Sequence, residues 1–269
     1  MPRLVRLITL AFVLATGPAF GVPITFDGIT LDAGSTFNRT IYHNPVSQVG
    51  DVLSGYGEVL QIFGPSGTTW TAGSGGYHLT YVFSGFVVSD ISPSYIGFMG
   101  GEVRFFVQNE SQPGYSALTP TPPGGANIGA DIANDFVEAG DGTLWLSTIG
   151  NTFNDAVSGK PVTLRSNGIG NDGFTLAGSI GLLDITGGSA AAYFQKDTIA
   201  DSQGSAADLQ FGSSFSNLSP LSNQDLSGSA DLRGIAIAQI PEPPPLVLLG
   251  AGFLAWGVGR RISYRPLAA

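Results

Sequence analysis

The chain has 269 residues, a formal net charge of −9 and no cysteine, which excludes disulfides, thiolate metal sites and cysteine nucleophiles. Hydrophobic residues make up 43% of the chain, and its 39 glycines and 17 prolines stay below the share typical of disordered low-complexity chains, so a folded body is expected. Between Val22 and Ile240 there are six basic and nineteen acidic residues, a balance of −13 that argues against a nucleic-acid partner and that we interpret as solubility outside the cell.

The N-terminus has the three parts of a secretory signal peptide, which we predict from Met1 to Gly21. Arg3 and Arg6 supply the positive start, and residues 7–15 form the apolar segment. Small residues precede the cleavage position, so signal peptidase is expected to cut between Gly21 and Val22.

The body, residues 22–240, is rich in strand patterns. Residues 77–84 alternate and place Tyr77, Leu79, Tyr81 and Phe83 on one face, which is the period-two pattern of a half-buried strand. Further strands are expected at residues 59–63, 103–107, 143–146, 161–165, 174–176, 179–186, 209–215 and 232–240.

Clusters of Gly, Asn, Asp, Ser and Pro separate these short strands, so we expect an all-β fold, either an antiparallel β-sandwich or a barrel-like body. The longest expected loop, residues 112–127, contains four prolines and is a place where the body could divide into two lobes. Residues 130–139 are the helix candidate of the body.

The two histidines are the candidates for a catalytic base, because a Ser or Thr nucleophile needs one. His78 alternates with the aromatic residues of its strand and is expected to face solvent, and His43 lies in a turn-like Tyr-His-Asn-Pro segment. The sequence has no Gly-x-Ser-x-Gly elbow between a strand and a helix. We therefore expect no enzyme and assign no catalytic residue, with a secreted hydrolase as the least favoured alternative.

Residues 168–173 match the Gly-x-Gly-x-x-Gly letters of a dinucleotide-binding loop. That loop needs a helix N-terminus after the glycines to hold the pyrophosphate, whereas strand-forming residues 174–176 follow here. We interpret the segment as a hairpin turn and expect no cofactor.

Acidic residues gather around the helix candidate. Asp131, Asp135 and Glu138 would share one helical face, and Asp141 follows in a Gly-Asp-Gly segment. The alternating pattern of a calcium loop is missing, so we interpret the group as a solvated acidic loop and assign no metal site.

Five aromatic residues offer another binding hypothesis: Trp70, Trp145, Tyr77, Tyr81 and Tyr95. Flat aromatic faces suit sugar rings, although most aromatic residues on strands belong to a core. A carbohydrate-binding adhesive module is therefore an alternative function.

The C-terminus, residues 241–269, combines three unlike parts in a fixed order. Pro241, Glu242 and Pro243 begin a stiff proline-rich entry, and an apolar run broken by glycines follows. This run has helical length but no polar face, which predicts a short transmembrane helix at about residues 245–259. Arg260 and Arg261 then mark the cytoplasmic side.

These parts together resemble the PEP-CTERM sorting signal of Gram-negative bacteria, which the membrane enzyme exosortase is thought to cut near the Pro-Glu-Pro. The resemblance implies that Pro241, Glu242, Pro243, Arg260 and Arg261 form the signal. It also implies export through the inner membrane, transient anchoring by the C-terminal helix, and delivery to the cell surface or extracellular matrix.

Short segments of the body, residues 50–58, 187–194 and 211–215, resemble the flocculation-associated PEP-CTERM proteins. That resemblance implies a secreted protein that helps cells to aggregate within an exopolysaccharide matrix. We therefore expect a non-enzymatic, exosortase-processed matrix or surface protein that supports aggregation or biofilm, with exopolysaccharide as a candidate partner.

Overall fold

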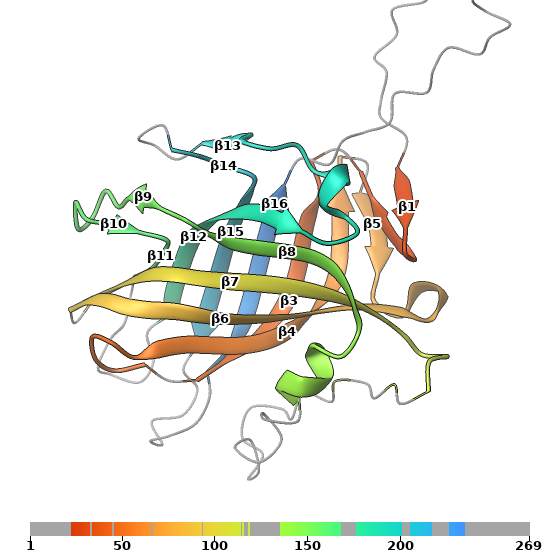
Figure 1. The fold of residues 1–269 in the computed structure, drawn as a ribbon, viewed down its shortest axis with the longest axis horizontal. Coiled ribbons are helices and arrows are strands. Elements are labelled where there is room, and N and C mark those ends of the chain that lie inside the picture. The colour runs from red at the N-terminus through yellow and green to blue at the C-terminus, as the bar shows by residue number, and fades with distance from the viewer. Residues whose placement is uncertain are drawn as a thin grey trace, which may run out of the picture. The chain divides into compact units, whose positions relative to one another are not determined.

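Long antiparallel strands dominate the structure, which is a computed structural model (Figure 1). It describes residues 23–32, 34–44, 46–65, 67–92, 94–113, 115, 118, 135–167, 176–200, 205–216 and 226–234. All of these residues belong to one unit, Pro23–Ala238.

Nine strands form the wall of a barrel: β3 (Thr36–His43), β4 (Val52–Gly64), β6 (Tyr77–Ser92), β7 (Tyr95–Asn109), β8 (Thr143–Asn151), β11 (Leu164–Asn167), β12 (Leu176–Gly187), β15 (Leu209–Ser216) and β16 (Leu226–Gly234). Neighbours in the wall pair antiparallel, and β16 returns to pair with β3. The sheet therefore closes into an eight-strand antiparallel barrel.

Two of the nine strands share one position in the wall, between β7 and β12. β8 pairs with residues 102–107 of β7, and β11 pairs with residues 95–98 of the same strand. Both also pair with β12. The short hairpin of β9 (Phe153–Asn154) and β10 (Pro161–Val162) is inserted between them.

The interior of the barrel holds the main core, because inward side chains alternate with outward ones along the strands. On β6, Leu79, Tyr81 and Phe83 lie inside, with exposures of 0%, 0% and 4%, as the alternation predicted. Towards one end of the barrel the rings of Phe37, Trp145 and Phe194 pack edge-on or tilted, with centroids 6.0 to 6.3 Å apart.

A glycine irregularity in the β6–β7 hairpin changes which side chains face inward. Ser84 pairs with Glu102 and Phe86 pairs with Gly100, so Gly85 and Gly101 have no paired partner in this ladder. Both have positive φ, 75° and 90°. Before Gly85 the odd-numbered residues of β6, such as Phe83, face the core. After it the even-numbered residues Phe86 and Val88 face the core.

Smaller elements lie outside the wall or at its ends: β1 (Ile24–Phe26) with β2 (Ile29–Leu31), β5 (Gly67–Thr71) beside β4, β13 (Ile199–Ala200) with β14 (Ala206–Ala207), and the 3-10 turns η1 (Ser74–Gly76) and η2 (Ala191–Tyr193). A helical turn, residues 135–139, covers the outer face of β4, β6 and β7. There Tyr56, Val82, Phe106 and Ala139 form a second apolar cluster.

The all-β prediction is confirmed. Of the two predicted architectures, a β-sandwich and a barrel-like body, the chain adopts the barrel. The strands expected around residues 59–63, 77–84 and 103–107 exist but continue further, as β4, β6 and β7. The expected strand at 161–165 is divided between β10 and β11. Residues 112–127 do not divide the sheet into lobes, because β7 and β8 on either side of them pair directly.

Several predictions fall outside the described residues. These are the signal peptide 1–21, the cleavage pair Gly21 and Val22, the helix at about 245–259, and the sorting residues Pro241, Glu242, Pro243, Arg260 and Arg261. Within the part of the chain that is described, no helix is both long and apolar enough to span a bilayer.

Candidate ligand-binding cavity

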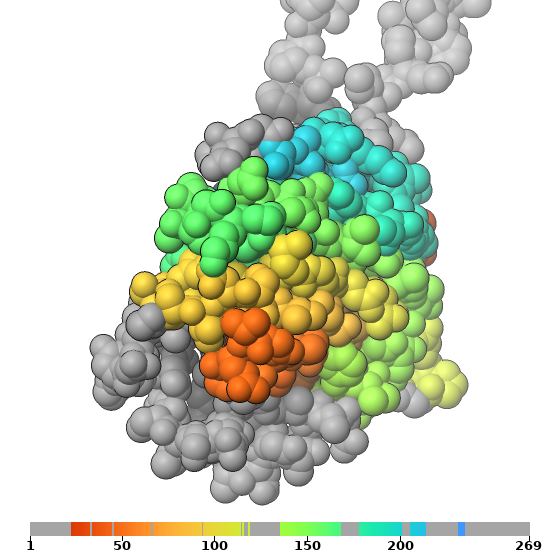
Figure 2. All heavy atoms as spheres, turned by 60° about the vertical axis from the view of Figure 1, so that its left-hand side comes forward, coloured from red at the N-terminus to blue at the C-terminus, as the bar shows by residue number. Residues whose placement is uncertain are grey.

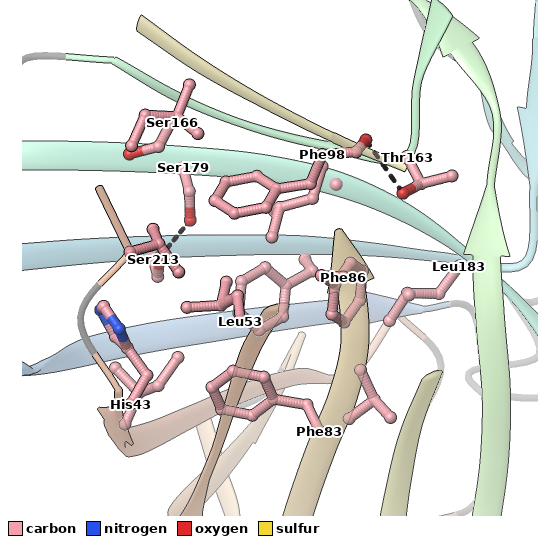
Figure 3. A pocket seen from close by; sticks show the side chains of 17 residues that line it. His43, Leu53, Phe83, Phe86, Phe98, Thr163, Ser166, Ser179, Leu183 and Ser213 are labelled. Carbon is pink, nitrogen blue, oxygen red and sulfur yellow. Dashed lines mark hydrogen bonds between the residues drawn. The ribbon is translucent and has the colours of Figure 1, made fainter. Parts of the chain in front are cut away.

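An apolar cavity of about 140 Å³ lies among the inward side chains of six wall strands, β3, β4, β6, β7, β12 and β15, with β11 completing its lining. Its apolar side consists chiefly of Leu53, Phe83, Phe86, Ile96, Phe98 and Leu183. Figure 3 shows the rings of Phe83, Phe86 and Phe98 converging on the centre of the space. Val46, from the loop before β4, also contributes to the lining.

Glycines on neighbouring strands make room for the aromatic rings. A Cβ atom added at Gly55 would lie 2.5 Å from the Phe83 ring, and one added at Gly101 would lie 2.3 Å from the Phe86 ring. Both distances are shorter than any ordinary carbon contact. The two rings therefore reach their positions in the cavity only because these strand residues have no side chain.

Hydroxyl groups form a row on one side of the cavity. Ser166 pairs across β11 and β12 with Ser179, and Ser179 pairs across β12 and β15 with Ser213. The hydroxyls of Ser179 and Ser213 are hydrogen-bonded to each other (Figure 3). Thr163 donates its hydroxyl to the carbonyl oxygen of Gly100 at 2.7 Å. The cavity thus has an apolar body and a narrow polar strip, as small-molecule sites commonly do.

His43 completes the polar strip from the last position of β3. Its side chain is 7% exposed, and its Nδ1 lies 2.7 Å from the carbonyl oxygen of Asn44, which accepts the Nδ1–H of the neutral ring. Burial lowers the pKa of His43 to about 4, against the smaller opposing effect of the Asn44 hydrogen bond. His43 is therefore neutral near pH 7.

The loop before β4 and the second half of β6 lie close together beside this part of the barrel. Gly50 donates its amide to the carbonyl of Val88, and Val52 pairs with Val87. In Figure 2 the first segment is the orange area and β6 and β7 are the yellow area next to it. Because Val46 in this loop and Phe86 on β6 both line the cavity, this pair of segments forms part of its surroundings.

No protein-family model, curated protein or solved structure matches this chain.

The residues of the cavity were not predicted as a group. The sequence offered His43 only as a candidate catalytic base, and it did not predict the strand β3 that contains this residue. The alternation of residues 36–43 was the available signal, since Phe37, Arg39, Ile41 and His43 are all buried and the residues between them are not. Polar residues at two of those inward positions hid the pattern.

His78 lies on the outer face of the barrel, as expected, but its side chain is only 17% exposed. Its Nδ1 is 2.6 Å from Glu58 and its Nε2 is 3.0 Å from Glu110, and the Tyr115 ring lies over it at 5.4 Å. Burial alone would lower the pKa of His78, yet the hydrogen bonds to both carboxylates outweigh it and raise the pKa. This arrangement stabilises an imidazolium ion rather than a base.

The acidic residues near the helical turn are not uniformly solvated, which corrects the interpretation as a solvated loop. Asp135 is 6% exposed and accepts a hydrogen bond of 2.7 Å from the Tyr56 hydroxyl. Asp141 accepts one of 2.9 Å from the Gln108 side chain, whose amide also donates to the carbonyl of Glu138. Asp131 lies outside the described residues. Across the described part of the chain no group of three or more His, Asp or Glu is arranged to hold a metal ion.

The aromatic residues considered for sugar stacking belong mainly to the core. Trp70, Trp145, Tyr81 and Tyr95 are between 0% and 5% exposed, and Tyr77 packs partly buried against the same cluster. These five side chains therefore do not form a row on the surface, which removes the specific support for a carbohydrate-binding face.

Proposed function

We propose that the barrel is a non-enzymatic carrier or receptor that binds one small, predominantly apolar molecule inside its wall. The single observation that carries the proposal is the cavity of about 140 Å³ bounded by Leu53, Phe83, Phe86, Phe98 and Leu183. An eight-stranded barrel is just wide enough either to fill its interior with side chains or to hold one small ligand. In this chain side chains fill the interior at the end that contains Trp145, and the cavity remains open in another part of the barrel.

The volume and the chemistry of the lining support a small apolar ligand. A dry protein cavity of about 150 Å³ lined by apolar side chains is large enough for benzene. Removing apolar ligand surface from water contributes roughly 25 cal/mol per Å². Among the described residues that line the cavity no acidic side chain is present, and the Ser179 and Ser213 hydroxyls bond each other, which favours binding over nucleophilic catalysis.

The test is a calorimetric titration of the purified full-length chain with benzene, which matches the volume of the cavity. Saturable binding is expected. Ser213→Phe places a ring in the cavity and should weaken binding by about tenfold or more, because the ligand and the added side chain compete for one space.

Gln210→Phe is the matched control, since Gln210 is on the same strand but alternates with the inward Leu209 and Phe211. It should bind benzene like the unaltered chain. Absence of saturable binding in the unaltered chain, or equal binding by the Ser213→Phe variant with a normal circular dichroism spectrum, would refute the cavity as the site.

A second proposal concerns where the barrel works. We infer that the chain is exported, anchored briefly by its C-terminal helix and cut by exosortase, so that the barrel becomes a cell-surface or matrix protein of a Gram-negative bacterium. The support is the order of Pro241, Glu242 and Pro243, the glycine-broken apolar run, and Arg260 with Arg261, together with the predicted signal peptide. A role in aggregation with exopolysaccharide is part of this proposal.

This proposal predicts two new ends in cells that produce the protein. Mass spectrometry of the mature chain should find an N-terminus at Val22 and a C-terminus near Glu242. Replacing Pro241, Glu242 and Pro243 by alanine should leave the C-terminal segment attached and the protein in the membrane fraction. Replacing Pro244 and Pro245 by alanine is the control, because these prolines lie outside the Pro-Glu-Pro and should not affect cutting. An intact C-terminus in the unaltered protein contradicts exosortase processing.

A further inference from the structure

Arg39 lies inside the barrel, beneath the cavity. It occupies an inward position of β3 between Phe37 and Ile41, and it is 1% exposed. Three aromatic rings surround the guanidinium carbon, at 4.5 Å for Phe211, 4.9 Å for Tyr81 and 5.9 Å for Phe105. A fully buried arginine is unusual unless an anion pairs with it.

The hydrogen-bonding groups of Arg39 are mostly unused. Its Nη2 donates to the backbone carbonyl of Asp231 at a long 3.3 Å. Its Nε and Nη1 are buried and have no hydrogen-bond partner among the described residues. None of the ion pairs found among those residues includes Arg39. A buried guanidinium with two unsatisfied donors destabilises the folded state, because those N–H groups have lost their water partners.

The residue keeps its charge in this setting. Burial lowers the pKa of Arg39 to about 10, and the nearby Tyr81 and Asp231 oppose part of that effect. At neutral pH the guanidinium is therefore protonated. The aromatic rings attract the cation, but they supply no acceptor in the plane of its N–H groups.

Two residues that line the cavity lie beside Arg39. Ile41, the next inward residue of β3, lines the cavity, and so does Phe211, whose ring lies against the guanidinium. The backbone register also connects Arg39 to the hydroxyl row, because Ala230 of β16 pairs with Arg39 on one side and with Ser213 on the other. A ligand in the cavity would therefore contact the same Phe211 ring that lies against the guanidinium.

We propose that the ligand is an amphiphilic monoanion, such as an alkyl carboxylic acid, whose head group displaces the Phe211 ring and accepts hydrogen bonds from Arg39 while its alkyl chain lies among Phe83, Phe86 and Phe98. This inference rests on the proposed binding function and names the class of ligand. A carboxylate matches the planar fork of a guanidinium and satisfies both unused donors at once. One buried cation in an otherwise apolar space favours one negative charge over two, since a second charge would be buried unpaired.

The test compares two ligands of equal chain length that match the volume of the cavity, butanoate and butan-1-ol, by calorimetric titration of the full-length chain at pH 7. Butanoate should bind about tenfold or more tightly than butanol, because hydrogen bonds to a charged group are the stronger ones. Arg39→Met, which keeps an unbranched side chain but removes its charge, should remove the preference and leave butanol binding in place. Arg233→Met is the control, because Arg233 is an exposed residue of β16, and it should keep the preference.

The possible outcomes separate this inference from the binding function on which it rests. If butanol binds as tightly as butanoate, or if Arg39→Met keeps the preference, the anion site is refuted and the apolar cavity stands. If neither compound binds, both proposals fail. If Arg39→Met does not fold, the unaltered chain decides through the carboxyl ¹³C resonance of bound [1-¹³C]butanoate. The resonance should show that the bound carboxylate stays ionised at a pH where the free acid protonates, and titration like the free acid overturns the inference.

Discussion

The two histidines of this chain lie in opposite environments, although the sequence suggested both as candidates for a catalytic base. His43 is enclosed by the wall of the barrel and donates to a neutral carbonyl, that of Asn44. His78 is enclosed by two carboxylates, Glu58 and Glu110. Burial disfavours the imidazolium at both sites, and only at His78 do the neighbours outweigh it. The pKa of His43 is therefore lowered and that of His78 is raised.

His43 should make the folded state less stable in acid. Its pKa is about 4 when folded and about 6.5 in a model peptide, so the unfolded chain binds the proton first as the pH falls. The stability is complete above pH 6.5 and is lost between about pH 6.5 and 4, by at most about 3 kcal/mol. Urea unfolding of the full-length chain across this range should show a shallower decline for His43→Gln than for the unaltered chain.

His78→Gln is the matched control for that experiment, because the sign reverses. A raised folded-state pKa contributes stability that is present below the unfolded pKa and lost as the pH rises through the folded pKa. Relative to the unaltered chain, His78→Gln should therefore lose more stability at low pH than at high pH. Equal pH profiles for the unaltered chain and His43→Gln would show that the pKa of His43 is the same in the barrel as in the unfolded chain, contrary to the lowered value.

At the scale of elements, period-two alternation identified the middle of each long strand but not its ends. Residues 77–84 were predicted as a strand because the aromatic alternation there is regular, yet β6 continues to Ser92. The predicted strand ended near Gly85, where the inward positions shift from odd to even numbers. This shift interrupts the alternation of apolar and polar residues in the sequence, although the strand continues. β3 was not predicted for another reason. Two of its inward residues, Arg39 and His43, are polar, so its inward positions do not form a run of hydrophobic residues.

Glycines inside the strands carry part of the packing, and Gly57 of β4 offers a test. A Cβ atom there would lie 2.1 Å from the carbonyl oxygen of Thr40 and 2.6 Å from the Tyr81 hydroxyl oxygen, so the backbone of β3 would have to move. Gly57→Ala should lower the free energy of unfolding by about 1–3 kcal/mol, the usual size of an overpacking effect. Chemical denaturation followed by tryptophan fluorescence measures it.

Gly187→Ala is the control for Gly57→Ala. Gly187 also lies in a strand, has no positive φ, and has no atom within 4 Å of the added Cβ. Its replacement should be neutral or slightly stabilising, because alanine loses less backbone freedom than glycine on folding. Equal stability of both variants would mean that β3 and β4 can separate to accept a methyl group, contrary to the packing described above.

At the scale of the whole molecule, the fold class was accessible from the sequence and the candidate site was not. Short alternating segments between turn residues predict an antiparallel all-β body. The sheet closes into a barrel because β16 pairs with β3, and no local sequence pattern predicts that pairing. The cavity depends on side chains such as Leu53, Phe98 and Ser213, which are far apart in the chain and meet only after β16 has paired with β3. Single residues in separate strands give no signal that they share one space.

Closure of the sheet also connects the two proposals. The pairing of β16 with β3 leaves the barrel wall without a free edge, which protects it from edge-to-edge aggregation. β16 ends at Gly234, before Pro241, so a cut at the Pro-Glu-Pro would leave every strand of the barrel in the released product. The cavity and Arg39 belong to those strands, and ligand binding should therefore be the same before and after processing. Sorting and binding would then be independent properties of one chain, the first determined by its termini and the second by its closed wall.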